Sequence, residues 1–211
     1  MPKAAASDVR RSLRGVARGA FALVVLSLLG GCVVNETRPQ PKLQALQARQ
    51  QIAEAELLDV AIRAFDPNVP AALAGNEEAL DKRRIYPEIR KAESRLLPAR
   101  LKATLEATGQ WGAVRVVPEG VAFVDVLVTG RIVESSGARL ELEVDAVDAT
   151  GRVWIRDKTY AGDADLGSYK TDASMRARDP FQNVYVQIAN DLLAARDVLA
   201  ANERREIRDV A

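Results

Sequence analysis

The spacing of apolar residues changes at Gly109, and this change constrains the fold more than any other feature of the chain. Before it, Leu97, Leu101 and Leu105 recur every four residues, which is the spacing of one face of an α-helix. Over residues 113–160, apolar and polar residues alternate instead, as in strands that bury one face. The sequence therefore predicts a helix followed by a run of strands in one domain.

Five segments of the chain predict strands. The first spans residues 57–65, where apolar and polar residues alternate before an Asp-Pro-Asn sequence. The other four span residues 113–117, 123–134, 138–147 and 152–160, and short sequences rich in Gly, Ser, Asp and Pro separate them. Such short connections predict that these four strands form a meander.

The two later turns of this meander predict which residues pair across the strands. A three-residue loop at 135–137 pairs Glu134 with Ala138, and the next turn pairs Asp148 with Gly151. The facing pairs that follow are Ile132 with Leu140, Val128 with Val144, Ala146 with Val153, Val144 with Ile155, and Leu142 with Asp157. This register makes one face of the sheet aliphatic, with Asp157 as its one exception.

Two segments predict helices that pack on the sheet. The first spans residues 87–108 and ends at a left-handed Gly109, while Pro98 indicates either a kink or the start of a new helix. The second begins with Asp179 as N-cap and Pro180 in the first turn. We therefore expect an α+β fold, a two-layer sandwich of a mainly antiparallel four- to five-stranded sheet with two packed helices.

The opposite face of the sheet carries a candidate interaction surface. In the predicted register, Arg131 lies beside Glu141, Arg156 beside Glu143 and Trp154 beside Asp145 of the neighbouring strand. Arg and Trp dominate binding hot spots. The alternative is an ordinary solvated face whose opposite charges pair across strands. Trp111, which follows the predicted end of the first helix, is expected to cap the core.

The N-terminal segment has the composition of a secretory signal. Five basic residues precede the apolar residues 20–29, and Gly30, Gly31 and Cys32 follow. This site resembles the lipobox of bacterial lipoproteins, which implies cleavage before Cys32 and acylation of that residue. A stretch of ten residues is too short to span a bilayer as a helix. By the same resemblance, Val33 after the cysteine implies sorting to the outer membrane.

These features divide the chain into four parts. Residues 1–31 are the predicted signal peptide, 32–42 a lipid anchor and flexible tether, 43–56 a weakly amphipathic spacer helix, and 57–211 a single α+β domain. Removal of the basic signal leaves a weakly acidic chain, which argues against binding of nucleic acid. The charged end at 202–209 has no glycine stop, so it either frays or contacts a partner.

The residue types of the chain exclude several kinds of chemistry. It contains no histidine, so Ser-His-Asp and Cys-His catalysis and histidine-based metal sites are excluded. Its one cysteine, Cys32, is taken up by the predicted anchor. No phosphate-binding glycine loop or dinucleotide fingerprint occurs, so we expect no cofactor. Residues 163–167 are similar to part of a calcium loop but lack its third acidic position and its distal glutamate, so we expect no metal.

Three stretches of the domain also resemble a known family. DVAIRAF at 59–65, ATLEATGQWGAVRVV at 103–117 and DVLVTGRI at 125–132 are similar to the first strand, the first helix and the second and third strands of the periplasmic CsgG / LpoB / TolB-N-terminal type of domain. Members bind other envelope proteins, for example to activate a peptidoglycan synthase or to assemble a secretion pore. The resemblance lies in hydrophobic patterns, so it carries no functional residue over to this chain, and the long membrane-inserting hairpins of a pore former are not evident.

Two functions follow as hypotheses. The first is an outer-membrane lipoprotein that faces the periplasm and binds another envelope protein as an accessory or assembly module, without being an enzyme. The second is a hydrolase of an envelope polymer that uses carboxylates, for which Asp145, Asp163 and Asp165 are the candidates.

Overall fold

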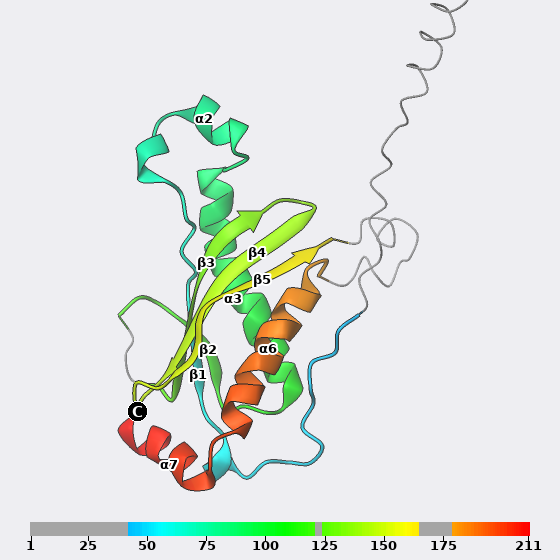
Figure 1. The fold of residues 1–211 in the computed structure, drawn as a ribbon, viewed down its shortest axis with the longest axis vertical. Coiled ribbons are helices and arrows are strands. Elements are labelled where there is room, and N and C mark those ends of the chain that lie inside the picture. The colour runs from blue at the N-terminus through cyan, green and yellow to red at the C-terminus, as the bar shows by residue number, and fades with distance from the viewer. Residues whose placement is uncertain (1–41, 121–123, 165–178) are drawn as a thin grey trace, which may run out of the picture. The chain divides into compact units, whose positions relative to one another are not determined.

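A computed structural model of the chain describes residues 42–120, 124–164 and 179–211. They form an α+β fold with one five-stranded mixed sheet (Figure 1). The strands are β1 (Val60–Arg63), β2 (Val114–Val117), β3 (Val126–Ser135), β4 (Arg139–Asp148) and β5 (Val153–Asp163). The helices are α2 (Glu77–Lys82), α3 (Pro87–Thr108), α6 (Gln182–Asp197) and α7 (Ala201–Val210), with short 3₁₀ turns at Glu54–Glu56 and Ala71–Leu73. The predicted signal peptide and Cys32 lie outside the described residues.

The order of the strands in the sheet is β2-β1-β3-β4-β5. The predicted meander is confirmed for β3, β4 and β5, which pair antiparallel, and it is wrong for β2. β1 lies between β2 and β3 and is parallel to both, with Val60 facing Val114 on one side and Val126 on the other. A parallel pair needs a crossover connection, and α3 supplies it between β1 and β2.

The hairpin of β3 and β4 has a different register from the predicted one. Ile132 faces Leu142 instead of Leu140, and Val128 faces Ala146 instead of Val144. At the turn, Glu134 faces Glu141 instead of Ala138, so the predicted three-residue loop is wrong. An irregularity between Ile132 and Glu134 then reduces the offset from three residues to two. The observed and predicted registers differ by two residues in the main part of the hairpin. Because side chains alternate with a period of two, the aliphatic residues still face the core.

The pairing of β4 with β5 also differs from the prediction. Ala146 faces Ile155, while Val144 faces Lys158 and Leu142 faces Tyr160. Irregularities flank Ala146, and Asp157 has a positive φ of 45°. These bulges shift β5 progressively along β4, and they remove Asp157 from its predicted place opposite Leu142.

Both long helices contribute to one core on the same face of the sheet. The core cluster includes Leu101 and Leu105 of α3, Tyr185 and Leu192 of α6, and Leu142 of β4. The two helices also contact each other. As predicted, α3 ends at Gly109, which has the left-handed φ of 64°. The two-layer arrangement therefore follows from the apolar stripes of the helices and the aliphatic face of the strands.

α3 continues through Pro98, so no second helix begins there. Proline has no N–H group, and at this position it leaves the carbonyl oxygen of Ser94 without its helical donor. The backbone N–H of Phe65, just after β1, donates to that oxygen at 2.8 Å. A buried acceptor is thereby satisfied by another element, which explains why the helix tolerates the proline.

The helix predicted for residues 43–56 is not formed. Residues 42–53, which we call the N-terminal segment, have no helix and lie against α6 and α3. Leu43 and Leu46 donate their N–H groups to the side chains of Asn183 and Asn190, at 3.1 and 3.0 Å. Ala48 donates to the backbone oxygen of Thr108 at 2.8 Å. These partners replace the intrahelical hydrogen bonds, and the sparse large apolar residues give a helix too little to bury.

The C-terminal elements differ from the predicted single helix. α6 begins at Gln182, and the carboxylate of Asp179 accepts the N–H of Phe181 at 2.9 Å before the helix starts. The charged end forms a separate helix, α7, which folds onto the turn at Glu54–Glu56 and buries Ile207 (Figure 1). Arg208 donates to the backbone oxygen of Glu54 at 2.7 Å. Among the helices described, none has the length and apolarity to cross a membrane.

Candidate functional site on the open face of the sheet

Alternate residues of β3, β4 and β5 point away from α3 and α6, and we call this side the open face. Arg131 and Glu143 face each other across β3 and β4, and the Arg131 Nη2 and Glu143 Oε1 atoms are 2.7 Å apart. Both side chains are partly exposed, so this ion pair contributes at most about 1 kcal/mol to stability. Of the predicted cross-strand charge pairs, Arg131 forms one, with Glu143 in place of Glu141, while Lys158 pairs with Asp191 of α6.

A shallow depression of about 290 Å³ lies on the open face. Apolar and charged side chains share it: Leu127, Thr129, Asp145, Val147, Val153, Arg156 and Asp157. Val153 is 43% exposed, so a large apolar side chain is accessible to solvent in this depression. An apolar floor beside an arginine is the kind of surface on which binding energy is concentrated in protein interfaces.

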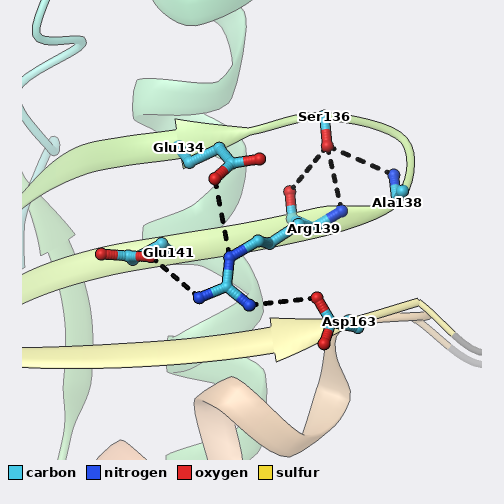
Figure 2. A network of polar contacts seen from close by, with 6 residues as sticks. All are labelled: Glu134, Ser136, Ala138, Arg139, Glu141 and Asp163. Carbon is cyan, nitrogen blue, oxygen red and sulfur yellow. Dashed lines mark hydrogen bonds and ion pairs between the residues drawn. The ribbon is translucent and has the colours of Figure 1, made fainter. Parts of the chain in front are cut away.

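The end of the open face is held by a network around Arg139 (Figure 2). Its guanidinium contacts carboxylates of three strands: Glu134 of β3 at 3.5 Å, Glu141 of β4 at 3.0 Å and Asp163 of β5 at 3.1 Å. The hydrogen bonds to Glu141 and Asp163 raise the pKa of Arg139. Ser136 closes the turn, since its hydroxyl accepts the N–H of Arg139 at 3.0 Å.

The structure places two of the three predicted surface residues on the open face. Arg131 and Arg156 lie there, and both are exposed. The prediction that Trp154 lies beside Asp145 is wrong, because the bulge at the start of β5 turns Trp154 toward the core. Its ring lies 6.3 Å from that of Trp111, and its Nε1 donates to Asp148 at 2.8 Å.

Trp111 belongs to the core, as predicted. Its side chain is buried, and the guanidinium of Arg196 from α6 lies 5.3 Å from the centre of its ring. Arg196 also donates through Nη2 to the side-chain oxygen of Gln110 at 3.0 Å. This cluster joins the C-terminal part of α6 to the end of α3, so its role is to hold these two helices together above the sheet.

The described candidates for carboxylate chemistry are engaged in structural contacts. Asp145 accepts the backbone N–H of Asp157 at 2.8 Å, and Asp163 pairs with Arg139. Asp165 and most of the predicted calcium-like segment lie outside the described residues. Within the described parts of the chain, no three acidic or cysteine side chains lie close enough together to hold a metal ion.

One pair of carboxylates, Asp59 and Asp125, was not predicted from the sequence. Asp125 accepts the N–H of Asp59 at 2.7 Å, and Asp59 in turn accepts the N–H of Ala113 at 2.7 Å. Burial raises the pKa of Asp125, and the nearby charge of Asp59 raises it further. Each aspartate precedes the valine that begins a parallel strand, and the register that pairs Val60 with Val126 brings them together. Their carboxylate oxygens accept the backbone N–H groups just before β1 and β2.

The comparisons with known proteins give only distant neighbours. No protein-family model and no curated protein matches the chain. The PelC dodecamer from Paraburkholderia phytofirmans is 14% identical, with a TM-score of 0.36, over 75% of this chain and 96% of that one. A putative neuraminyllactose-binding hemagglutinin homologue from Helicobacter pylori is 12% identical, with a TM-score of 0.22, over 82% and 95%. Similarity at this level is too low to transfer a function or a site to this chain.

Proposed function

We propose that this chain is a lipoprotein of the outer membrane that binds another envelope protein through the open face of its sheet. In this proposal Cys32 carries the lipid, and the domain faces the periplasm. The protein acts as an accessory or assembly module, and no catalytic step is assigned to it.

The observation that carries the proposal is the depression on the open face. Val153 and the neighbouring Leu127 and Val147 offer apolar contact, and Arg156 provides a cation within the same depression. Arg156 forms no hydrogen bond or ion pair through its side chain to any other described residue, whereas Arg131 is paired with Glu143. A cation that the fold itself does not use is available to a partner.

The N-terminal segment supports the second half of the proposal, the tethering of the domain. Its hydrogen bonds to Asn183 and Asn190 fix the point from which the chain leaves the domain, close to α6. The ten residues from 32 to 41 span at most roughly 35 Å when fully extended. An anchor at Cys32 would therefore keep the domain near the membrane surface.

Crosslinking in intact cells, followed by affinity capture of the chain, tests the binding function. We expect the wild-type chain to capture a specific envelope protein, and Arg156→Glu to reduce its recovery at least about fivefold. Arg49→Glu is the matched control, because Arg49 is an exposed arginine of the N-terminal segment. Equal recovery with Arg156→Glu and wild type, or no envelope protein above background, would contradict the proposal.

Two further measurements separate the parts of the proposal. Mass spectrometry of the mature N-terminus is expected to find an acylated Cys32, and an unmodified terminus would contradict the anchor. Release of fragments from purified envelope polymers tests the competing hydrolase hypothesis. Activity that disappears in Asp145→Asn or Asp163→Asn would favour that hypothesis over a binding module.

A further inference from the structure

A second concave site adjoins the depression on the open face, and Thr129 lines both. It is a groove of about 900 Å³ beyond the ends of β1 and β2, bordered by the first half of α3. β1 and β2 are parallel and end together, with Arg63 facing Val117. The carboxyl ends of parallel strands are the usual place for ligands in open sheets, because the chain diverges there and leaves a crevice.

The wall of the groove is fixed by contacts that involve the backbone. Phe65 donates its N–H to the oxygen of Ser94, the acceptor that Pro98 leaves unused, and Asp66 donates to the oxygen of Gly130 at 2.8 Å. A Cβ atom at Gly130 would lie 2.9 Å from the ring of Phe65, so only glycine permits this close approach. The segment after β1 is therefore held between α3 and β3, and the groove is formed before a ligand arrives.

The cations of the groove come from two elements. Arg63 lies at the end of β1, and Lys91 and Arg95 lie one turn apart on α3. Lys91 and Arg95 are exposed, and neither side chain forms a hydrogen bond or ion pair with another described residue. Two cations of the groove are thus free to bind an anion.

The same groove also contains acidic and apolar groups. Asp66 and Glu119 line it, together with Pro67 and Pro118. Asp66 is partly used by the fold, because one of its carboxylate oxygens accepts the N–H of Asn68 at 2.7 Å. These acidic side chains repel every anion, and they repel a ligand with closely spaced phosphates more strongly than one whose single charges lie apart. A ligand that carries separate carboxylates among apolar groups fits this mixture better.

The spacing of the two free cations indicates the form of the ligand. Side chains four residues apart on a helix have Cβ atoms about 5–6 Å apart. Alternate side chains of an extended peptide point to the same side and lie roughly 6.6 Å apart, from two steps of about 3.3 Å. Lys91 and Arg95 therefore match two acidic side chains separated by one residue. The one aromatic side chain of the groove, Phe65, is 1% exposed, so it offers no surface on which a sugar ring could stack.

From these observations we infer that the groove binds an extended acidic peptide segment, with acidic residues at alternate positions, that belongs to the partner protein. This inference rests on the proposed binding function and adds a second contact site to it. Lys91 and Arg95 each bind one carboxylate of the segment, and residues between these carboxylates contact the prolines of the groove.

Fluorescence anisotropy with the purified full chain in detergent tests this inference. The probe is a short, labelled peptide of alternating Glu and Ala, acetylated and amidated at its ends. We expect saturable binding that weakens with salt, about a threefold loss for Lys91→Gln or Arg95→Gln, and about tenfold for the double variant. Arg49→Gln is the control and should bind like wild type. A peptide with Gln in place of Glu should not bind.

Three outcomes would overturn the inference. The first is no binding of the Glu peptide by a wild-type chain that unfolds cooperatively, and the second is equal binding by the double variant. The third is tighter binding of oligogalacturonate, an acidic glycan, with the same dependence on Lys91 and Arg95. The two cations are exposed, so the variants are expected to fold, and their thermal unfolding checks this. None of these three outcomes would affect the capture of an envelope protein that depends on Arg156. The inference about the groove can therefore fail while the proposed function holds.

Discussion

The two faces of the sheet contribute differently to the stability of the fold. On the covered face, Val128, Leu142 and Val144 are fully buried beneath α3 and α6, and each contributes about 1.5–3 kcal/mol through burial. On the open face, Arg131 and Glu143 form a partly exposed ion pair that contributes at most about 1 kcal/mol. One face therefore supplies most of the stability, and the other can change its side chains with little effect on folding.

The largest expected effect comes from adjacent residues on the two faces. Leu142 is fully buried and faces both Ile132 and Tyr160, so Leu142→Ala should lower the free energy of unfolding by about 3 kcal/mol. Glu143→Ala, one position along the same strand, should lower it by less than about 1 kcal/mol. Urea unfolding monitored by circular dichroism measures both changes. Similar losses for the two variants would break the comparison.

A second pair compares aspartates of β4 that belong to different faces. Asp148 accepts hydrogen bonds from the Thr150 side chain and N–H, the Arg152 N–H and the Trp154 indole, whereas Asp145 accepts the N–H of Asp157. We expect Asp148→Ala to cost about 2 kcal/mol and Asp145→Ala about 0.5–1 kcal/mol. Urea unfolding gives the energies. Tryptophan fluorescence should shift only for Asp148→Ala, and a shift of equal size in both variants would contradict the assignment of Trp154.

The sequence predicted the faces of the central strands better than it predicted their partners. Alternation in β3 and β4 identified Ile132 and Leu142 as buried, and the difference from the observed register was even, which left them inside. Trp154 was assigned to the wrong face, because a bulge inserts a residue without a distinctive sequence. For the same reason, the apolar floor around Val153 was missed although Arg156 was correctly placed on the open face.

Other features depended on residues far apart in the chain. The continuity of α3 through Pro98 relies on the N–H of Phe65, and the extended N-terminal segment relies on amides of α6 such as Asn190. The groove combines Arg63 with Lys91 because α3 packs beside β1. Local sequence patterns predict helices and strands, but they do not predict which distant residues these elements contact.

A smaller effect is expected for the charged network at the end of the open face. Arg139→Ala leaves Glu134, Glu141 and Asp163 close together without their cation, and we expect a loss of about 1 kcal/mol. Repulsion among exposed carboxylates is screened by salt, so this loss should shrink at high ionic strength. Arg156→Ala is the control, with an expected change within about 0.5 kcal/mol. Urea unfolding at low and high salt measures the loss of stability in both variants. A loss for Arg139→Ala that is independent of salt would indicate a packing role for Arg139.

The smallest effect concerns a carboxylate that, unlike those of the open face, is buried. Burial raises the pKa of Asp125, so the folded state holds a proton on it more readily than the unfolded chain does. The stabilisation linked to this proton is complete below the unfolded pKa and is lost as the pH rises through the raised folded value. Asp125→Asn keeps an oxygen that can accept the N–H of Asp59 but removes the titration. We therefore expect wild type to gain stability relative to Asp125→Asn as the pH falls from about 7 to about 4. Urea unfolding of both proteins across this range measures the difference, and a constant difference, or one of opposite sign, would show that Asp125 is not held in a desolvated site.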